Sequence, residues 1–132
     1  MLLTKVVLND LGVYRGRNEF DFKTTQEKPV ILIGGTNGAG KTTLFESVML
    51  CLYGQDSFEE KKSKKEYQEI IGRSIHRYLG IKKSAEEASV VIEFQFSHEG
   101  KIDEFQVIRM WQNNDGRIDE TLTIKKKNST EE

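Results

Sequence analysis

The sequence is poor in residues that build covalent, metal-bound or membrane-spanning structure. Cys51 is the only cysteine among 132 residues, so the chain forms no internal disulfide and suits a reducing compartment. Its apolar surroundings predict a buried, unreactive thiol. The two histidines, His76 and His98, have no carboxylate–cysteine cluster beside them, so we expect no zinc or nucleophile site. No stretch approaches the roughly 20 apolar residues of a membrane span, and Asp10 and Arg15 interrupt any signal-peptide pattern. We therefore expect a cytoplasmic protein with no membrane partner.

Charge and hydrophobicity are those of an ordinary soluble chain. Hydrophobic residues make up 36%, charged residues 31%, and the formal net charge is −1. Such a balance neither indicates nor excludes a nucleic-acid partner. A chain of this length forms one domain or a piece of one.

One glycine-rich segment has an order of residues that is typical of a specific chemistry. Residues 30–33 (V-I-L-I) predict a strand that begins after Pro29, the only proline, where no ladder N–H is needed. Residues 35–42 (G-T-N-G-A-G-K-T) fit G-x-x-x-x-G-K-[ST], the phosphate-binding loop of nucleotide triphosphatases. Residues 41–53 then predict a helix that is apolar around most of its circumference, with Gly54 as its stop. Because a strand precedes the motif and a helix follows it, we favour a nucleoside triphosphate site over a chance glycine turn.

Each position of this loop has a chemical task. Glycine lets the backbone approach a phosphate and turn N–H groups toward it, and the helix start adds the positive end of its dipole. Lys41 is predicted to contact the β- and γ-phosphates, Thr42 to ligate Mg²⁺, and Thr43 to lie near the α-phosphate through its N–H or Oγ. The predicted nucleotide-binding residues of the loop are Gly35, Thr36, Asn37, Gly38, Ala39, Gly40, Lys41, Thr42 and Thr43. Lys41 is also the predicted catalytic residue, and Thr42 the predicted metal ligand.

The rest of the chain predicts antiparallel strands and one more helix. Alternating apolar residues predict strands at residues 2–8, 19–22, 90–96, 102–111 and 118–124. A charged, exposed loop at 56–65 precedes an amphipathic helix at 64–79. Off its apolar stripe, Arg73, His76 and Arg77 are predicted to face solvent or a partner.

These elements predict a mixed α/β fold of the P-loop NTPase class. A βαβ-type nucleotide unit would share the chain with an antiparallel β-meander. Residues 1–124 would form the N-terminal part of an ATPase head, and residues 125–132 a polar tail or truncation point.

An acidic partner for the phosphate loop is missing. A complete triphosphatase needs four apolar strand residues ending in Asp, often followed by Glu, to hold Mg²⁺ and the attacking water. Residues 90–93 (V-V-I-E) come nearest, but the alternation that follows is typical of a strand with one exposed face. No Ser-Gly-Gly signature for a second subunit's γ-phosphate is present either. The pattern indicates the front half of a split head, the remainder of which follows a long coiled-coil insertion.

Together these motifs resemble the SMC-like ATPases, which include chromosome-structure and double-strand-break-repair proteins. The resemblance to this superfamily rests on residues 37–43 (N-G-A-G-K-T-T), the strand beginning at Leu2, and Arg15. Other pieces are similar to DndD, the ATPase family of bacterial DNA phosphorothioation (sulfur modification). Those pieces are residues 7–16 (V-L-N-D-L-G-V-Y-R-G), 31–46, 50–54 (L-C-L-Y-G) and 73–77 (R-S-I-H-R).

The resemblance implies ATP and Mg²⁺ as ligands, with ATP sandwiched in a head-to-head homodimer. It also implies the C-terminal half of the same head, DNA and other DNA-modification proteins as partners, and a nucleoid-associated place in a bacterial or archaeal cytosol. Arg15 matches an arginine near the nucleotide phosphates or the DNA-facing surface; the alternative is a plain surface arginine in a turn. The family's glutamine loop and later motifs have no counterpart here. We therefore expect this chain to bind ATP without efficient hydrolysis, and the full-length protein to be an ATPase.

Three alternatives remain open. The chain could belong to another SMC-like DNA-repair ATPase. A small P-loop kinase would need an acidic strand, lid arginines and a substrate pocket, and the antiparallel C-terminal third argues against it. The third is a nucleotide-gated DNA- or protein-binding module without turnover, in which ATP only orders the turn at 12–17 and the charged loop.

Overall fold

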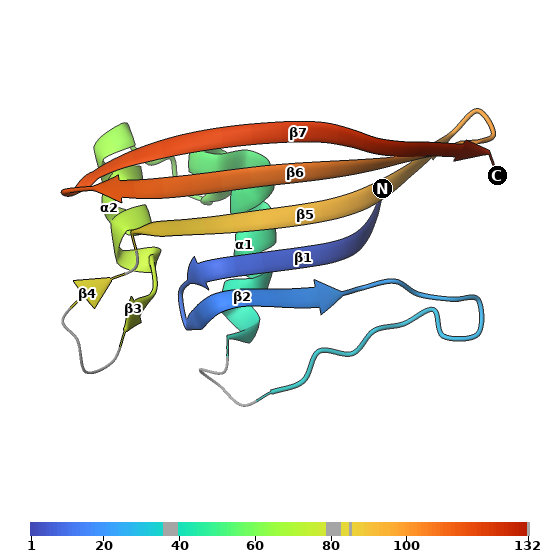
Figure 1. The fold of residues 1–132 in the computed structure, drawn as a ribbon, viewed down its shortest axis with the longest axis horizontal. Helices are drawn as coiled ribbons and strands as arrows, with labels where there is room; N and C mark the ends of the chain where they lie inside the picture. The colour runs from blue at the N-terminus through green and yellow to red at the C-terminus, as the bar shows by residue number, and fades with distance from the viewer. Residues whose placement is uncertain (36–39, 79–82, 85, 132) are drawn as a thin grey trace.

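A five-stranded antiparallel sheet, in the order β2-β1-β5-β6-β7, carries both α-helices on one face (Figure 1). The computed structural model describes residues 1–35, 40–78, 83–84 and 86–131. The elements in chain order are β1 (Leu2–Leu11), β2 (Tyr14–Asp21), α1 (Lys41–Tyr53), the 3₁₀-helix η1 (Gly54–Ser57), α2 (Lys64–Ser74), β3 (Arg77–Tyr78), β4 (Lys83–Ser84), β5 (Glu87–His98), β6 (Lys101–Asn114) and β7 (Arg117–Glu131). Within the part of the chain described, no helix is long and apolar enough to cross a membrane.

The C-terminal third is the predicted β-meander. Strands β5, β6 and β7 pair in sequence through two tight turns, at Glu99–Gly100 and Asp115–Gly116, whose residues all have positive φ. Such two-residue turns match the right-handed twist of the flanking strands. Residues 125–131, predicted as a polar tail, are instead part of a strand: β7 continues to Glu131 and pairs with β6 along its length. Ladder hydrogen bonds hold a strand even where its side chains show no apolar pattern.

The first two strands extend this sheet on its other side. Strand β1 pairs with both β2 and β5, and β2 forms an edge of the sheet. Every pairing in the sheet is antiparallel, so the predicted βαβ unit, which requires parallel strands, is wrong for the described residues. The structure is an α/β fold with an antiparallel sheet.

Residues 30–33 do not form the predicted strand. They are extended and exposed, with Leu32 at 92% and Val30 at 73% of full exposure. A strand persists only where its N–H and C=O groups find a neighbouring strand. No described residue pairs with this segment. The apolar residues 30–33 therefore have no strand neighbour among the described residues. Pro29 does not precede a strand in the structure.

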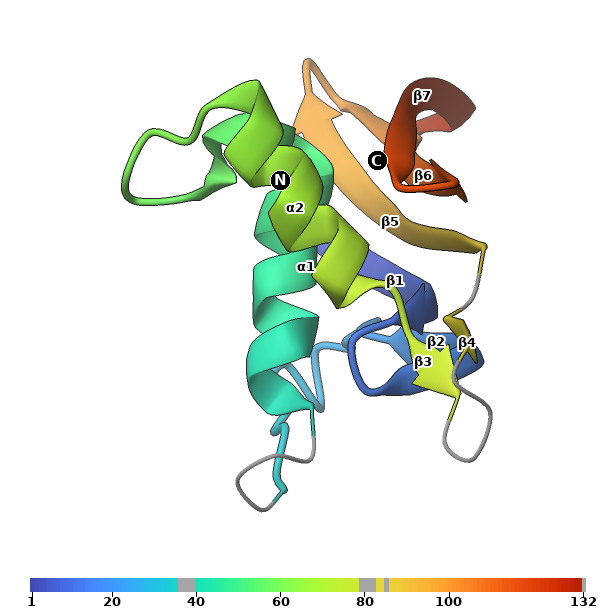
Figure 2. The same cartoon turned by 90° about the vertical axis from the view of Figure 1, so that its left-hand side faces the viewer.

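Helix α1 has the predicted bounds but a different environment. Leu44, Ser47 and Cys51 pack on the sheet, and Gly54 follows as the helix stop. The prediction of burial around most of the circumference is wrong, because an apolar stripe at four-residue spacing faces outward: Phe45, Met49 and Tyr53. Figure 2 shows α1 flanked by the sheet and α2 on one side only.

Helix α2 begins where it was predicted and ends five residues early. Ser63 and Glu66 form a capping box at its start. The helix ends at Ser74, and Ile75 instead makes a β-bridge with Leu11 of β1. Tyr67, Ile71 and Ile75 are buried against the sheet, as the apolar stripe predicted. A backbone pairing at Ile75 thus overrides the helical periodicity.

Arg73 and His76 were both predicted to face solvent or a partner, and the structure differs between them. Arg73 is exposed, as predicted, whereas His76 is half-buried. The His76 backbone N–H donates to the Asp10 carbonyl at 2.7 Å, and its Nδ1 lies 2.9 Å from the Gly12 carbonyl oxygen. His76 therefore anchors the β1–β2 turn rather than facing solvent.

A polar cluster of buried donors around the partly exposed Glu120 carboxylate joins the sheet to both helices. Trp111 Nε1 donates to Glu120 Oε1 at 2.6 Å, and the Tyr67 hydroxyl donates to the same oxygen. Arg109 lies 3.5 Å from that oxygen and donates through Nε to the Cys51 carbonyl at 3.0 Å, near the end of α1. Burial, with the Glu120 carboxylate next in effect, raises the pKa of the Tyr67 hydroxyl. The cluster fixes the C-terminal end of α1 and the first turn of α2 on one surface.

Candidate nucleotide-binding site

The start of α1 is the part of the predicted phosphate loop that the structure describes. Gly40 is the N-cap residue, with φ of 102° and ψ of 5°, and its carbonyl accepts the Leu44 N–H at 2.9 Å. A residue with a Cβ adopts this φ only with strain. Gly40 makes no side-chain cap, and the first turn of α1 contains no acidic residue. The positive end of the helix dipole is therefore not offset by a side chain of its own first turn.

Lys41 and Thr42, the two residues predicted to meet phosphate and Mg²⁺, both lie exposed at this helix end. N–H groups at a helix start and a cation beside them form an arrangement suited to an anion such as a phosphate. Gly35 is exposed at the other end of the motif. The other predicted contacts, Thr36, Asn37, Gly38 and Ala39, lie outside the described residues. The nucleotide-contacting roles of the loop residues stay predictions.

The β1–β2 turn packs directly against this helix start, a contact that the sequence pattern did not predict. The Tyr14 hydroxyl donates to the Gly40 carbonyl at 2.9 Å. A Cβ placed on Gly12 would lie 2.8 Å from Thr43 Cγ2, so Thr43 sits against the turn. The G-x-Y-R-G pattern at residues 12–16 was the available signal, but it indicated a family rather than a contact.

Arg15 lies next to Tyr14 on β2, with its side chain exposed. Alternation along the strand sends neighbouring side chains to opposite faces, so Tyr14 points to the helix side and Arg15 away from it. Arg15 follows Tyr14, whose hydroxyl reaches the Gly40 carbonyl. A nucleotide or DNA contact by its guanidinium stays a prediction.

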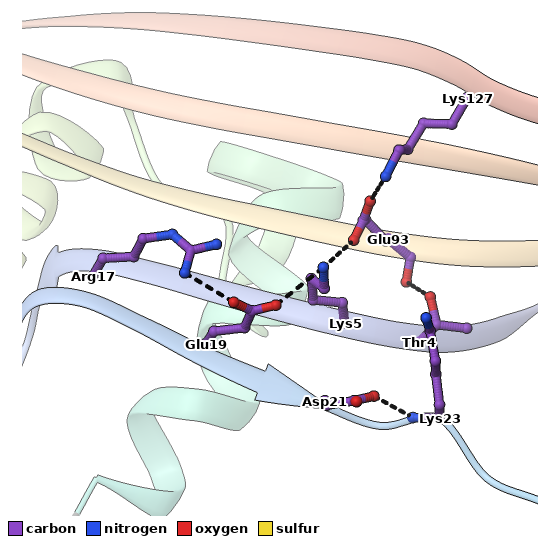
Figure 3. A network of polar contacts seen from close by, with 8 residues as sticks. All are labelled: Thr4, Lys5, Arg17, Glu19, Asp21, Lys23, Glu93 and Lys127. Atoms are coloured by element: carbon purple, nitrogen blue, oxygen red, sulfur yellow. Dashed lines mark hydrogen bonds and ion pairs between the residues drawn. The ribbon is translucent and has the colours of Figure 1, made fainter.

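Glu93, the nearest candidate for an acidic catalytic residue, lies on the opposite face of the sheet. Its neighbour Ile92 is buried on the helix side, whereas the Glu93 carboxylate pairs with Lys5 at 3.2 Å and with Lys127 (Figure 3). Burial acts to raise the pKa of Glu93, but the two ammonium groups outweigh it and hold the pKa below its usual value. Figure 3 shows the ion-pair ladder continuing through Glu19 to Arg17. Glu93 is thus a structural charge that pairs with two lysines on the face away from the helices.

The other reactive side chains that the structure describes form no second site. Burial raises the pKa of the Cys51 thiol to about 11, and its Sγ lies 3.5 Å from the Val90 carbonyl oxygen. This confirms a buried, unreactive cysteine. Among the described residues, no group of three or more His, Cys, Asp or Glu side chains could hold a metal ion. Thr42 stays the predicted Mg²⁺ ligand.

A groove of about 620 Å³ runs between α1 and α2 and borders the helix start. Thr42 and Thr43 line it near the phosphate loop, and Met49, Phe58 and Ile70 contribute apolar surface further along. Such a lining suits packing against an apolar segment more than binding of phosphate.

Comparison with known proteins identifies the family. A model of the AAA domain family matches residues 5–132. The chain is 35% identical over 57 residues to the SbcC component of the nuclease SbcCD from Vibrio cholerae, covering 43% of this chain and 6% of that protein. It is 48% identical over 56 residues to the DNA double-strand break repair Rad50 ATPase of Nanoarchaeum equitans, covering 42% of this chain and 6% of that protein. The SbcC component of the same nuclease from Staphylococcus haemolyticus is 36% identical over 56 residues, covering 42% of this chain and 5% of that protein.

These matches support the SMC/ABC-type P-loop ATPases as the wider group predicted from the motifs, although they do not single out DndD. The chain matches only a small fraction of the length of these relatives. Because the family model covers nearly the whole sequence, the chain belongs to the AAA domain family of P-loop ATPases.

Proposed function

We propose that this chain binds ATP with Mg²⁺ at the start of α1 and forms the N-terminal part of an ATPase head that hydrolyses ATP in the full-length protein. The observation that carries this proposal is the helix start itself. Gly40, Lys41 and Thr42 stand at an N-terminus that no described side chain caps and whose first turn contains no acidic residue. A bound triphosphate would supply the missing negative charge, with Lys41 and Thr42 as its phosphate and Mg²⁺ contacts.

The catalytic acid would come from outside this chain. Glu93 is held in an ion-pair ladder on the far face of the sheet. The proposal is therefore that this chain alone binds ATP without efficient turnover, and that the C-terminal half of the same head contributes the acidic residues.

The outward-facing apolar surface of α1 supports the C-terminal half of the head as the partner of this chain. The stripe formed by Phe45, Met49 and Tyr53, together with the exposed segment at 30–33, lies uncovered. Surfaces of this kind are normally covered by another protein surface. The unpaired segment at 30–33 would then receive its strand neighbours from the partner. The small share of the relatives' length that this chain matches leaves ample sequence for such a partner.

DNA metabolism is the proposed setting. The similar proteins include a nuclease component and a DNA double-strand break repair ATPase, by their names. The G-x-Y-R-G and R-S-I-H-R pieces favour DNA phosphorothioation by a DndD-type protein, and a DNA-repair ATPase is the alternative. In either case two heads would sandwich ATP as a homodimer that acts on DNA and on other DNA-modification proteins, in the cytosol near the nucleoid. The phosphorothioation role would be rejected if disruption of the gene left DNA sulfur content unchanged.

Calorimetry with Mg²⁺-ATP tests the binding step. Wild type is expected to bind and Lys41→Ala to lose at least about tenfold in affinity, because charge-assisted contacts to phosphate are worth roughly 1.5–3 kcal/mol. Lys61→Ala, a change of the same type in the loop before α2, is the matched control and should bind as wild type does. Equal binding by Lys41→Ala, or none by a folded wild type, would reject the proposal. ATP turnover by the chain alone would reject the proposal that the catalytic acid comes from outside this chain.

Adding back the C-terminal half of the head distinguishes an ATPase from a nucleotide-gated binding module. Turnover that appears in the mixture, and that Lys41→Ala abolishes, supports the ATPase. Tight ATP binding without turnover in the mixture would instead favour the nucleotide-gated binding module.

A further inference from the structure

We propose that the Tyr14 hydroxyl is a positioning group for the nucleotide site: it holds the Gly40 carbonyl and so fixes the end of the phosphate loop from the β1–β2 turn. This inference rests on the proposed ATP binding at the start of α1. Tyr14 itself would not touch the nucleotide.

The contact is directional and closely fitted. The Tyr14 hydroxyl donates to the Gly40 carbonyl at 2.9 Å, and the same oxygen accepts the first helical hydrogen bond, from Leu44, at 2.9 Å. A Cβ on Gly40 would lie 2.5 Å from Tyr14 Oη and 2.7 Å from Cζ. The tyrosine therefore occupies the space that any side chain at Gly40 would need.

Gly40 needs such an external support. Its φ of 102° is one of several conformations open to glycine, so the residue does not hold it by its own preference. Among the described residues, no side chain caps α1 at this point. Among the described contacts, the bond from Tyr14 is the side-chain interaction that fixes the Gly40 carbonyl.

Tyr14 is held on a rigid base. Its ring packs edge-on against Phe20 at 5.6 Å between centroids, and Phe20 stacks on Phe22 at 6.4 Å. These three rings share the helix side of β2 and the residues just after it. Aromatic pairs of this geometry favour one ring orientation.

The turn that carries Tyr14 is itself held by the end of α2 and by His76. Gly12 N–H donates to the Ser74 carbonyl at 2.6 Å, and His76 Nδ1 lies 2.9 Å from the Gly12 carbonyl oxygen. The Asp10 carboxylate accepts the Gly16 N–H at 2.7 Å within the turn. The turn thus connects the end of α2 to the phosphate loop, so Lys41 and Thr42 begin their helix from a defined point.

Tyr14→Phe is the test, because it keeps the ring and its packing and removes only the hydroxyl. We measure Mg²⁺-ATP and Mg²⁺-ADP affinity by calorimetry well below the unfolding temperature, where the dissociation constant reports the folded state. We expect about a three- to tenfold loss of affinity for both nucleotides, the size of one hydrogen bond that orders a binding group.

Two tyrosines of the same chain provide controls. Tyr53→Phe changes an exposed residue of α1 and should alter neither stability nor affinity. Tyr67→Phe removes a half-buried hydroxyl bonded to Glu120 and should lower the unfolding midpoint with wild-type nucleotide affinity. A merely structural Tyr14 would behave like Tyr67.

The outcomes separate this inference from the proposed function. Wild-type affinity in Tyr14→Phe, together with lost binding in Lys41→Ala, would overturn the positioning role and leave ATP binding intact. Failure of folded wild type to bind ATP would overturn both. A loss of affinity in Tyr14→Phe that Tyr67→Phe matches would also reject the role, because it would trace to general destabilisation.

Discussion

The sheet side of the molecule and the phosphate-loop side differ in how far their polar groups are paired and their apolar side chains are covered by this chain. Around Trp111, the indole N–H, the Tyr67 hydroxyl and the Arg109 guanidinium, all from buried residues, meet the partly exposed Glu120 carboxylate. Among the described residues, every buried side-chain nitrogen and oxygen has a partner. Around the loop, by contrast, Leu32 and Phe45 are 92% and 73% exposed.

The difference shows which contacts this chain supplies and which it leaves to another segment. Buried polar groups are costly unless paired, so a fully paired cluster indicates a region whose structure is self-sufficient. Large exposed apolar side chains indicate a surface that another segment would cover. Three predictions test this contrast, the first with the largest expected effect.

Trp111→Ala should destabilise the fold by about 3–5 kcal/mol, because it leaves a large cavity in the core and removes a donor to Glu120. The free energy of unfolding in urea measures this loss. Met110→Ala, on the other face of the same strand and 38% exposed, should cost well under half as much. Equal losses in the two variants would show that the cluster is not the stabilising centre of the sheet side.

Asp103 should make stability depend on pH in the acid range. Its carboxylate accepts from Ser129 Oγ at 2.6 Å, lies 2.7 Å from His98 Nε2 and pairs with Lys126 at 3.4 Å. These contacts, the Ser129 and His98 hydrogen bonds first, lower its pKa to about 2. Because the folded pKa lies below the unfolded value of about 3.9, the contribution is complete above about pH 4 and is lost as pH falls toward 2.

Denaturant unfolding of wild type and Asp103→Asn between about pH 5 and pH 2 measures this effect. The wild-type advantage should shrink as pH falls. Asp119→Asn, a change of the same type near the β6–β7 turn, is the matched control. A constant gap between wild type and Asp103→Asn would contradict the assignment.

Leu32→Ser should have the smallest effect on this chain. Leu32 has almost no contacts to lose, so the free energy of unfolding should change by less than about 0.5 kcal/mol. Leu8→Ser, the same change at a fully buried position of β1, should cost more than about 3 kcal/mol. When the C-terminal half of the head is added, Leu32→Ser should weaken association. A loss from Leu32→Ser comparable to that from Leu8→Ser would show that residues 30–33 already pack on this chain.

Local pattern determined much of the fold. The alternation of Val90, Ile92 and Phe94 predicted a strand with one buried face, and the Asp115–Gly116 pair is typical of the hairpin turn that joins β6 to β7. Helix α1 begins at Lys41 and ends at Tyr53 as predicted, because the glycines at 40 and 54 both stand at its ends. These features depend on a residue and its near neighbours, and that information is present in the sequence.

Other features depended on partners far along the chain. Residues 30–33 have the composition of a buried strand, yet a strand needs a neighbour, and no described segment pairs with them. Residues 125–131 have no apolar pattern, yet β6 supplies a ladder for them. The helical periodicity beyond Ser74 yields to the bridge between Ile75 and Leu11. In each case, backbone pairing outweighed side-chain pattern.

For the candidate site, the sequence by itself determined the motif: the phosphate-loop residues, their order and the family to which the chain belongs. Only the tertiary structure brought Tyr14 to Gly40 and Gly12 to Thr43, across 26 residues in the first pair. It also decided that Glu93 faces away from the loop. A motif records which groups are present, whereas distances between them follow from how the strands pair and the helices pack, and these depend on the whole chain.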